Sequence, residues 1–174
     1  MASKPLVVFM RGVNVGKNKR FKPADLARDL ARFEVVNIGA AGTFIVRAAP
    51  SEAVIHAAIS AWMPFYVDMM ITPGAEVQTL EFPDYREQGD VRRFVSVLAK
   101  RPPKPPPLPL AVPEGEWQVK FLAITGKFAL SLWRRATVGA PYYPNGVFEK
   151  HFGVSATTRD WKTILRIRAV LDGG

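Results

Sequence analysis

The sequence contains no cysteine and only two histidines among its 174 residues. The lack of cysteine excludes disulfide bonds, thiolate metal sites and a cysteine nucleophile. Two histidines supply few ligands for a zinc ion, so we expect no bound metal. Acidic residues are also scarce, because 15 Asp and Glu stand against 24 Lys and Arg, a net charge of +9. A chain this cationic favours nucleic acid, phosphorylated ligands or an acidic surface as partners.

Long apolar runs are missing as well. No run approaches the roughly 20 residues that a membrane-spanning helix needs. The N-terminal Met-Ala-Ser-Lys-Pro lacks the features of a signal peptide before the first short apolar run. We therefore expect a cytoplasmic protein without a membrane partner. A hydrophobic content of 48% suits one large or two small domains.

Residues 1–72 show the order strand, helix, strand, strand, helix, strand. Pro23 suits the first turn of the first helix, and Ser51 suits the N-cap of the second, which Pro64 ends. Apolar and β-branched runs predict strands at 6–10, 35–38, 43–48 and 65–71. This order is typical of a ferredoxin-like unit, an antiparallel sheet with both helices on one face.

Residues 73–174 predict a second α+β half, a plait with permuted strand order. Its elements are a short helix at 72–80, strands at 92–99, 117–124 and 128–133, a helix from Asn145 or Gly146 to 153, and a last helix opening at Thr157. Seven prolines between 102 and 113 exclude a helix or central strand there. We predict an extended, polyproline-like excursion over 101–113. The predicted fold class is therefore α+β, with two ferredoxin-like halves.

A basic segment directly follows the first strand. Arg11 to Arg20 reads R-G-V-N-V-G-K-N-K-R, without an acidic residue. Glycine permits positive φ, exposed backbone amides cup anions, and an arginine fork binds phosphate or carboxylate. The G-x-x-x-G-K spacing is one residue short of a Walker A loop and lacks the following Ser or Thr, so we reject a nucleotide hydrolase. The predicted ligand-binding residues are Arg11, Gly12, Asn14, Gly16, Lys17, Asn18 and Lys19.

A second candidate lies near the C-terminus. Thr157 to Asp160 predicts a capping box that opens the last helix, and helix N-termini attract anions. The predicted ligand-binding residues here are Thr157, Thr158 and Arg159, with Asn145 as an orienting amide. If the halves bring both blocks together, these residues converge with Arg11 and Lys17 on one anion site. The alternative is that Thr157 and Asp160 only cap the helix.

Three blocks occur together in a distinctive order: R-G-V-N-V-G-K-N-K after the first strand, P-N-G at 144–146, and T-T-R-D-W-K-T at 157–163. With these blocks the chain resembles the bacterial family catalogued as domain of unknown function 1697, whose members typically read R-G-I-N-V-G-G and T-T-R-N-W-N-T. The resemblance spans the chain and implies two ferredoxin-like halves. Asp160 and Lys162 stand where the family usually has two Asn. The resemblance implies no biochemical activity.

A weaker signal is a basic and aromatic surface. Paired arginines at 92–93 and 134–135 lie near Trp117, Phe128 and Trp133. Plait sheets use such surfaces to stack single-stranded bases, although the RNA-reader signature is absent and alternation favours the core for most of these rings. His56 and His151 are expected at the surface, and Asp25 and Asp29 are expected to pair with neighbouring arginines.

Our leading hypothesis is a protein that binds a phosphorylated metabolite, a nucleotide or a nucleic-acid backbone through the two basic blocks. No general base or nucleophile stands out, so we predict no catalytic residue and no cofactor. An enzyme acting on a nucleotide or sugar phosphate is one alternative. A structural or protein-interaction domain is the other.

Overall fold

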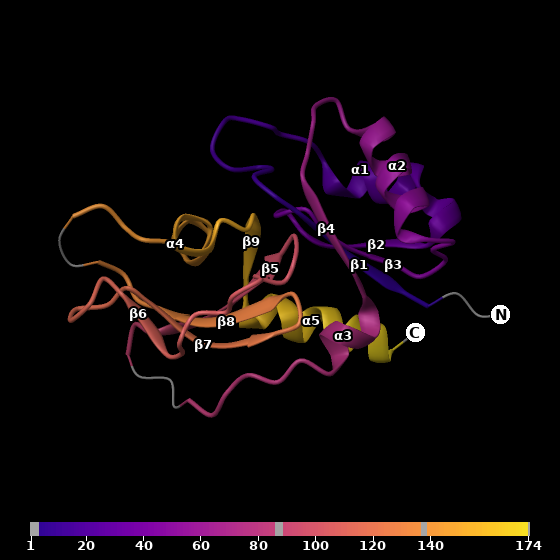
Figure 1. Cartoon of the computed structure of the whole chain (residues 1–174). Helices are drawn as coiled ribbons and strands as arrows, with labels where there is room; N and C mark the ends of the chain where they lie inside the picture. The colour runs from indigo at the N-terminus through magenta and orange to yellow at the C-terminus, as the bar shows by residue number, and fades with distance from the viewer. Residues whose placement is uncertain (1–3, 86–88, 137–138, 174) are drawn as a thin grey trace. The chain divides into compact units, whose positions relative to one another are not determined.

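The computed structural model describes residues 4–85, 89–136 and 139–173 and has the predicted α+β class, with two antiparallel sheets (Figure 1). The chain forms two compact units. Unit 1 comprises residues 1–79 and 165–174, and unit 2 comprises residues 80–164. The boundary that we expected at residues 72 and 73 falls within a strand of unit 1.

Unit 1 contains a four-stranded sheet whose neighbouring strands are all antiparallel. The strands are β1 (Leu6–Met10), β2 (Val35–Gly39), β3 (Thr43–Val46) and β4 (Met69–Pro73), in the order β2-β3-β1-β4. The chain order of strands and helices is the predicted one. β4 begins four residues later than predicted, because its partner β1 ends at Met10, which pairs with Met69.

Two helices cover one face of this sheet (Figure 1). They are α1 (Pro23–Asp29), followed by a short 3-10 turn at Ala31–Phe33, and α2 (Glu52–Trp62). Ser51 caps α2 as predicted, since its side chain accepts from the Val54 N–H at 3.3 Å. Leu26 of α1 and Ile59 of α2 belong to the core that includes Val8 of β1. The burial of these side chains contributes to the apolar stabilisation of unit 1.

Unit 1 also holds α3 (Gly74–Gln78) and the later residues of α5 (Trp161–Asp172). Arg47 Nη2 donates to the carbonyl of Val170 at 2.9 Å, and Arg168 Nε donates to the carbonyl of Val77 at 3.0 Å. These bonds attach residues near the C-terminus to the first half of the sequence.

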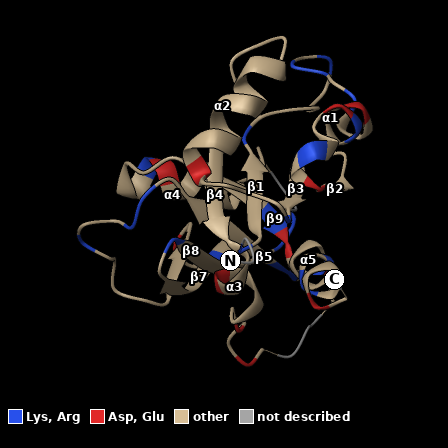
Figure 2. Ribbon diagram, turned by 90° about the vertical axis from the view of Figure 1, so that its right-hand side faces the viewer, with Lys and Arg blue, Asp and Glu red and all other residues tan. Residues whose placement is uncertain are grey.

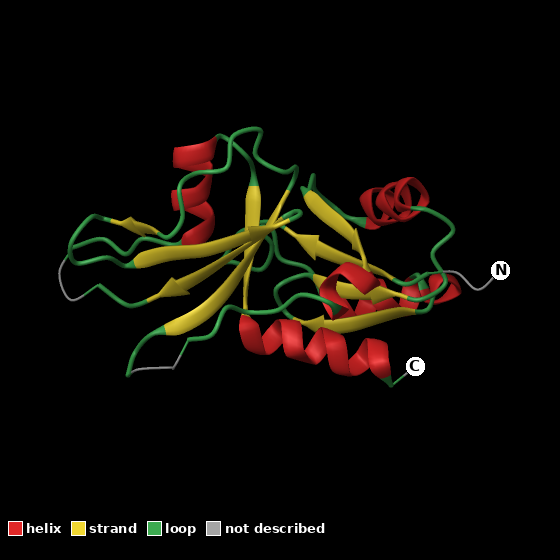
Figure 3. Cartoon of the chain, turned by 60° about the horizontal axis from the view of Figure 1, so that its bottom comes forward, coloured by secondary structure: helices red, strands yellow, loops and turns green. Residues whose placement is uncertain are grey.

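Unit 2 contains a five-stranded antiparallel sheet (Figure 3). Its strands are β5 (Arg92–Leu98), β6 (Leu110–Val112), β7 (Val119–Thr125), β8 (Phe128–Trp133) and β9 (Ala156–Asp160), in the order β6-β7-β8-β5-β9. If β6 is set aside, the order is β7-β8-β5-β9. Counted along the chain within each unit, both sheets then have their second, third, first and fourth strands side by side, as in β2-β3-β1-β4. The expected permutation is therefore absent from this sheet, and the proline-rich segment takes the chain position of the first helix. β6 is an edge strand, where proline neighbours are tolerated.

The helix α4 (Pro144–Phe152) covers one face of this sheet. Val147 and Phe148 of α4 pack into the core with Phe121 of β7. Gly153 ends α4 with φ +62°, a conformation that favours glycine, and confirms the predicted helix end. The predicted hairpin is also confirmed, since Thr125 pairs with Phe128 across two turn residues.

The prediction that a helix opens at Thr157 is wrong. Residues Ala156–Asp160 form β9, antiparallel to β5, and α5 begins only at Trp161. Asp160 Oδ1 accepts from the Thr163 N–H at 2.8 Å and from its hydroxyl at 2.7 Å, so Asp160 itself caps α5. Two adjacent β-branched threonines fit a strand, and the true capping pattern starts three residues after the predicted one.

None of the helices in the described part of the chain combines the length and apolar character that crossing a membrane requires.

Candidate functional site

The basic segment Arg11 to Arg20, called the basic loop below, connects β1 to α1 and is built as a small hairpin. Val15 and Asn18 form an isolated antiparallel bridge, with Gly16 and Lys17 as the turn. Gly16 has φ +59°, the positive value that the first central residue of a type II′ turn needs. Val13 is 3% exposed and belongs to the core of unit 1. The loop therefore has a buried base and an exposed tip.

Asn14 holds the base of this hairpin together. Its Nδ2 donates to the carbonyl of Ala40 at 2.8 Å, and its Oδ1 accepts from the Phe21 N–H at 2.9 Å. Its backbone N–H donates to the carbonyl of Lys19 at 3.0 Å. Its φ of +53° is a left-handed value that asparagine tolerates better than most residues. The amide predicted to orient a ligand thus orders the loop backbone.

Basic residues follow closely on one another along the tip of the loop, where the ribbon is blue in Figure 2. The side chains of Lys17, Lys19 and Arg20 are exposed, as are Gly12, Asn18 and the following Lys22. Arg20 Nη1 donates to the carbonyl of Gly16 at 3.0 Å, which ties this guanidinium to the turn. The basic composition of this loop is what the sequence predicted, whereas its fixed backbone was not predicted.

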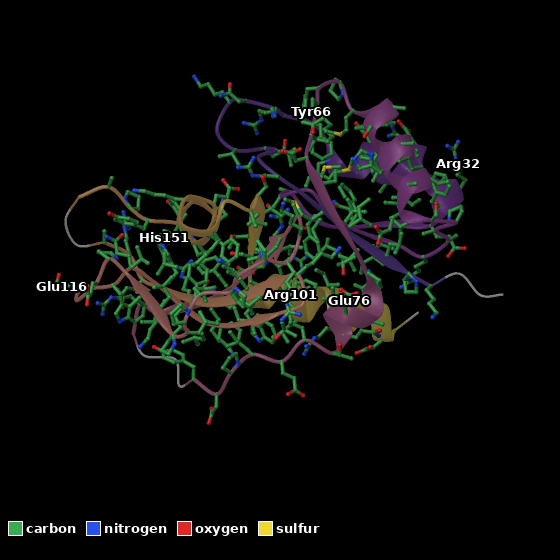
Figure 4. The ribbon with its side chains drawn as sticks, in the orientation of Figure 1. Arg32, Tyr66, Glu76, Arg101, Glu116 and His151 are labelled. Carbon is green, nitrogen blue, oxygen red and sulfur yellow. The ribbon has the colours of Figure 1, made fainter. Side chains whose placement is uncertain are left out.

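Arg11 lies at the base of the loop. Its Nη1 is 3.6 Å from Asp68 Oδ2, and its backbone N–H donates to the carbonyl of Asp68 at 2.9 Å. The hydroxyl of Tyr66, labelled in Figure 4, donates to Asp68 Oδ1 at 2.7 Å, and this bond raises the pKa of Tyr66. Asp68 therefore balances part of the Arg11 charge, and the exposed cations lie farther along the loop.

The C-terminal block has a different environment from the predicted one, because it lies in a strand. Arg159 is 7% exposed, and its Nη1 donates to Thr157 Oγ1 at 2.9 Å and to the carbonyl of Thr158 at 3.0 Å. Burial lowers the pKa of Arg159 to about 10. Thr158 Oγ1 lies 2.8 Å from Ser96 Oγ on β5. Arg11 belongs to unit 1 and Arg159 to unit 2, and their convergence stays a prediction.

Asn145, the remaining predicted residue, lines a groove of about 590 Å³ in unit 2. Lys150 and His151 of α4 also line this groove, as do Tyr142 and Tyr143. His151, labelled in Figure 4, is exposed as expected. Lys150, a residue that we did not predict, gives this groove a positive charge.

The sequence reasoning missed the two tyrosines that precede α4. Tyr143 is 58% exposed and Tyr142 is 41% exposed. The ring of Tyr143 stacks on Trp133, while Arg134 lies over the ring of Trp117 at 4.4 Å. Phe128 is buried in the core, as alternation predicted. The dipeptide Tyr-Tyr just before a proline that opens a helix was the available signal.

The histidine and the two aspartates that the sequence singled out on the helices of unit 1 are exposed or form local pairs. His56 is exposed, and its Nδ1 lies 3.5 Å from Ser60 Oγ. Arg28 pairs with Asp25 at 2.9 Å and Asp29 at 3.0 Å, as predicted. Within residues 4–85, 89–136 and 139–173, no group of three or more His, Asp and Glu side chains is placed to hold a metal ion.

Neither a protein-family model, nor a curated protein, nor a solved structure matches this chain.

Proposed function

We propose that the protein binds nucleic acid through the phosphate backbone, with the basic loop as the contact surface. The observation that carries this proposal is the set of exposed cations, Lys17, Lys19 and Arg20, on a hairpin whose base is fixed. Lysine and arginine side chains that neutralise phosphates release counterions, which supplies most of non-specific affinity. Membership of the resembling family also stays a proposal, and it adds no activity.

The form of the loop favours a polymer over a small metabolite. Small ligands are usually bound in concave pockets that bury most of their surface. The residues from Val15 to Lys19 are instead exposed at a hairpin tip. A protruding tip contacts charges that are spread along a chain, and a net charge of +9 adds long-range attraction to such a polyanion.

The fixed backbone supports the same function. Asn14 ties the loop to Ala40 and Phe21, so the cations do not have to order the loop when they bind. A preorganised loop loses less conformational entropy on binding than a free one. Arg11, whose charge Asp68 partly balances, contributes less in this proposal than the three cations at the tip.

The test is fluorescence anisotropy of labelled oligothymidylate and of a labelled duplex between about 50 and 200 mM salt. A triple variant, Lys17→Gln with Lys19→Gln and Arg20→Gln, should bind more weakly. Its log–log salt slope should be shallower by roughly 0.7 for each lost single-strand contact, about 2 in total. The matched control removes the same charge from exposed positions of unit 2, by Lys100→Gln, Arg101→Gln and Lys104→Gln.

Equal loss of affinity in the loop variant and the control variant would refute the proposal, because net charge alone would explain it. Tight, salt-insensitive binding of a phosphorylated metabolite would replace the polymer with a small ligand and reopen the enzyme alternative. No binding of either oligonucleotide by the wild type would favour the protein-interaction alternative.

A further inference from the structure

Unit 2 carries a row of three aromatic rings that ends at the surface. Phe94 meets Trp133 edge-on, at 85° with centroids 5.9 Å apart, and Trp133 lies parallel to Tyr143, at 8° and 6.0 Å. The indole N–H of Trp133 donates to the carbonyl of Tyr142 at 2.7 Å. The orientation of Trp133 is therefore fixed by packing on one side and by a hydrogen bond at its edge.

Tyr143 is the outermost ring of this row. One face of its ring contacts Trp133, and the side chain is still 58% exposed, so the other face is open to solvent. Its backbone is extended, with φ −119° and ψ +145°, and its carbonyl accepts from the Val147 N–H at 3.0 Å in the first turn of α4. Pro144 follows and restricts the same backbone. An open aromatic face on a rigid support is suited to stacking a planar ligand.

Two grooves adjoin Tyr143 and share Pro141 and Tyr143 as lining residues. One groove, of about 590 Å³, carries Lys150 beside His151. The other, of about 500 Å³, carries Arg92 and Arg135 with one acid, Asp90. Cations therefore line both of the grooves that Tyr143 borders.

We propose that Tyr143 stacks an unpaired nucleobase and that Lys150, Arg92 and Arg135 contact the phosphates next to that base. The ligand class is a planar base joined to phosphate, which a single-stranded nucleic acid or a free nucleotide would provide. Aromatic platforms flanked by cations are the usual means of binding single strands without sequence preference. The site differs from the basic loop in residues and in chemistry, so it does not depend on that proposal.

Charge decides between this ligand and a proline-rich peptide, which also binds in grooves lined by Tyr and Trp. The two grooves contain three arginine or lysine side chains and one aspartate. Such a surplus matches phosphates, whereas a proline-rich peptide needs no cation for its apolar contacts. Two grooves that meet at one ring also suit a strand that continues on either side of the stacked base.

The experiment compares fluorescein-labelled oligothymidylate with an abasic oligonucleotide of equal length, using the full chain. The abasic strand keeps the phosphates and lacks the bases, so the ratio of the two affinities measures stacking alone. We expect the wild type to prefer the strand with bases. Tyr143→Ala should lower the affinity for oligothymidylate by roughly 5- to 150-fold, the range for one stacked base. It should leave the affinity for the abasic strand nearly unchanged.

Three further variants make the test specific. Tyr143→Phe keeps the ring and should bind as the wild type does. Tyr85→Ala removes a half-buried tyrosine of the same unit that lines neither groove, and should not change the base preference. Arg135→Gln should lower the affinity for both oligonucleotides. Lys104→Gln, at an exposed position outside both grooves, should lower it less. Circular dichroism and thermal melting confirm that each variant is folded.

Equal affinity of the wild type for both strands would overturn the proposal, even if the basic loop binds phosphates. Unchanged oligothymidylate binding by Tyr143→Ala would overturn it as well. Binding of a proline-rich peptide that requires Tyr143, without binding of oligothymidylate, would replace the nucleobase with a peptide. Competition by uridine monophosphate at concentrations near those of the strand would support a free nucleotide as the source, and lack of competition would support a strand.

Discussion

The side-chain amide of Asn14 donates to the carbonyl of Ala40, 2.8 Å away and 26 residues later in the sequence. This bond links the basic loop to the turn between β2 and β3. The same side chain accepts from the backbone of Phe21, so one residue closes the loop from two directions. The loop is therefore ordered by a residue that belongs to it.

Replacing Asn14 with glycine keeps the left-handed backbone accessible and removes both side-chain bonds. We expect the free energy of unfolding to fall by about 1 to 3 kcal/mol, since each bond contributes roughly 0.5 to 1.5. Oligonucleotide affinity should also fall, because the cations of a loose loop must be ordered on binding. Urea denaturation and anisotropy measure the two effects. The control Asn18→Ala, at the exposed tip, should change stability by less than about 0.5 kcal/mol; equal effects would show that Asn14 has no special role.

The sequence predicted the basic loop well because its signals are local. A buried strand, two glycines and a run of cations lie within 15 residues of one another, and no distant contact is needed to recognise them. The clamp made by Asn14 was not predicted, because its partner Ala40 is distant in sequence. Composition indicates that a loop is basic, but it does not identify the contacts that fix the conformation of the loop.

Gly42 and Gly126 allow a second test, which separates the cost of close packing from the cost of a left-handed backbone. Both have positive φ, +73° and +57°. A Cβ on Gly42 would lie 2.7 Å from Met10 Cβ and Val13 Cγ2, whereas no atom of the described residues lies within 4 Å of a Cβ on Gly126. Gly126→Ala should cost about 1 to 2 kcal/mol for the left-handed backbone alone. Gly42→Ala should cost roughly 1 to 3 kcal/mol more from overpacking, measured by urea denaturation. A similar loss for both would mean that the core around β1 yields easily.

The last helix shows where local reasoning failed. Thr157 and Asp160 have the spacing of a capping box, yet Thr157 lies in β9 and Asp160 caps α5. A capping pattern alone does not determine the first residue of a helix, because several polar residues in a row can each act as the N-cap. The start of α5 is decided by the pairing of β9 with β5, which lies about 60 residues earlier in the chain. Tyr143 was missed for a similar reason, since its contact with Trp133 marks it more clearly than the Tyr-Tyr dipeptide before Pro144 does.

Two buried serines of the unit 2 sheet should respond in opposite ways to the same substitution. Ser96 Oγ lies 2.8 Å from Thr158 Oγ1, whereas Ser131 Oγ is buried and has no hydrogen-bond partner among the residues that the structure describes. Ser96→Ala removes a bond and leaves Thr158 with one partner fewer, so it should destabilise by about 1 kcal/mol. Ser131→Ala removes an unsatisfied hydroxyl and should be neutral or stabilising, by up to about 1 kcal/mol. Thermal melting of the two variants side by side tests this, and a large loss for Ser131→Ala would indicate an unseen partner such as bound water.

Asp29 should make part of the stability depend on acidic pH. The bond from the Trp62 indole N–H, at 3.0 Å, lowers the pKa of Asp29 below its ordinary value, and the bond from Arg28 lowers it further. The unfolded chain therefore takes up the proton first as the pH falls. The stabilisation is complete above the pKa of Asp29 in the unfolded chain, about 4. It is lost as the pH falls through the lower pKa of Asp29 in the folded protein.

Asp29→Asn removes this titration and keeps an oxygen that accepts from Trp62. We expect its melting temperature to fall less steeply than that of the wild type below about pH 4. Trp62→Phe, which removes the largest cause of the shift but keeps the acid, should have an intermediate slope. Thermal melting at several pH values measures the slopes, and carboxyl NMR of the wild type measures the pKa directly. Parallel curves for wild type and Asp29→Asn would show that the exposed carboxylate gains nothing from its two donors in the folded state.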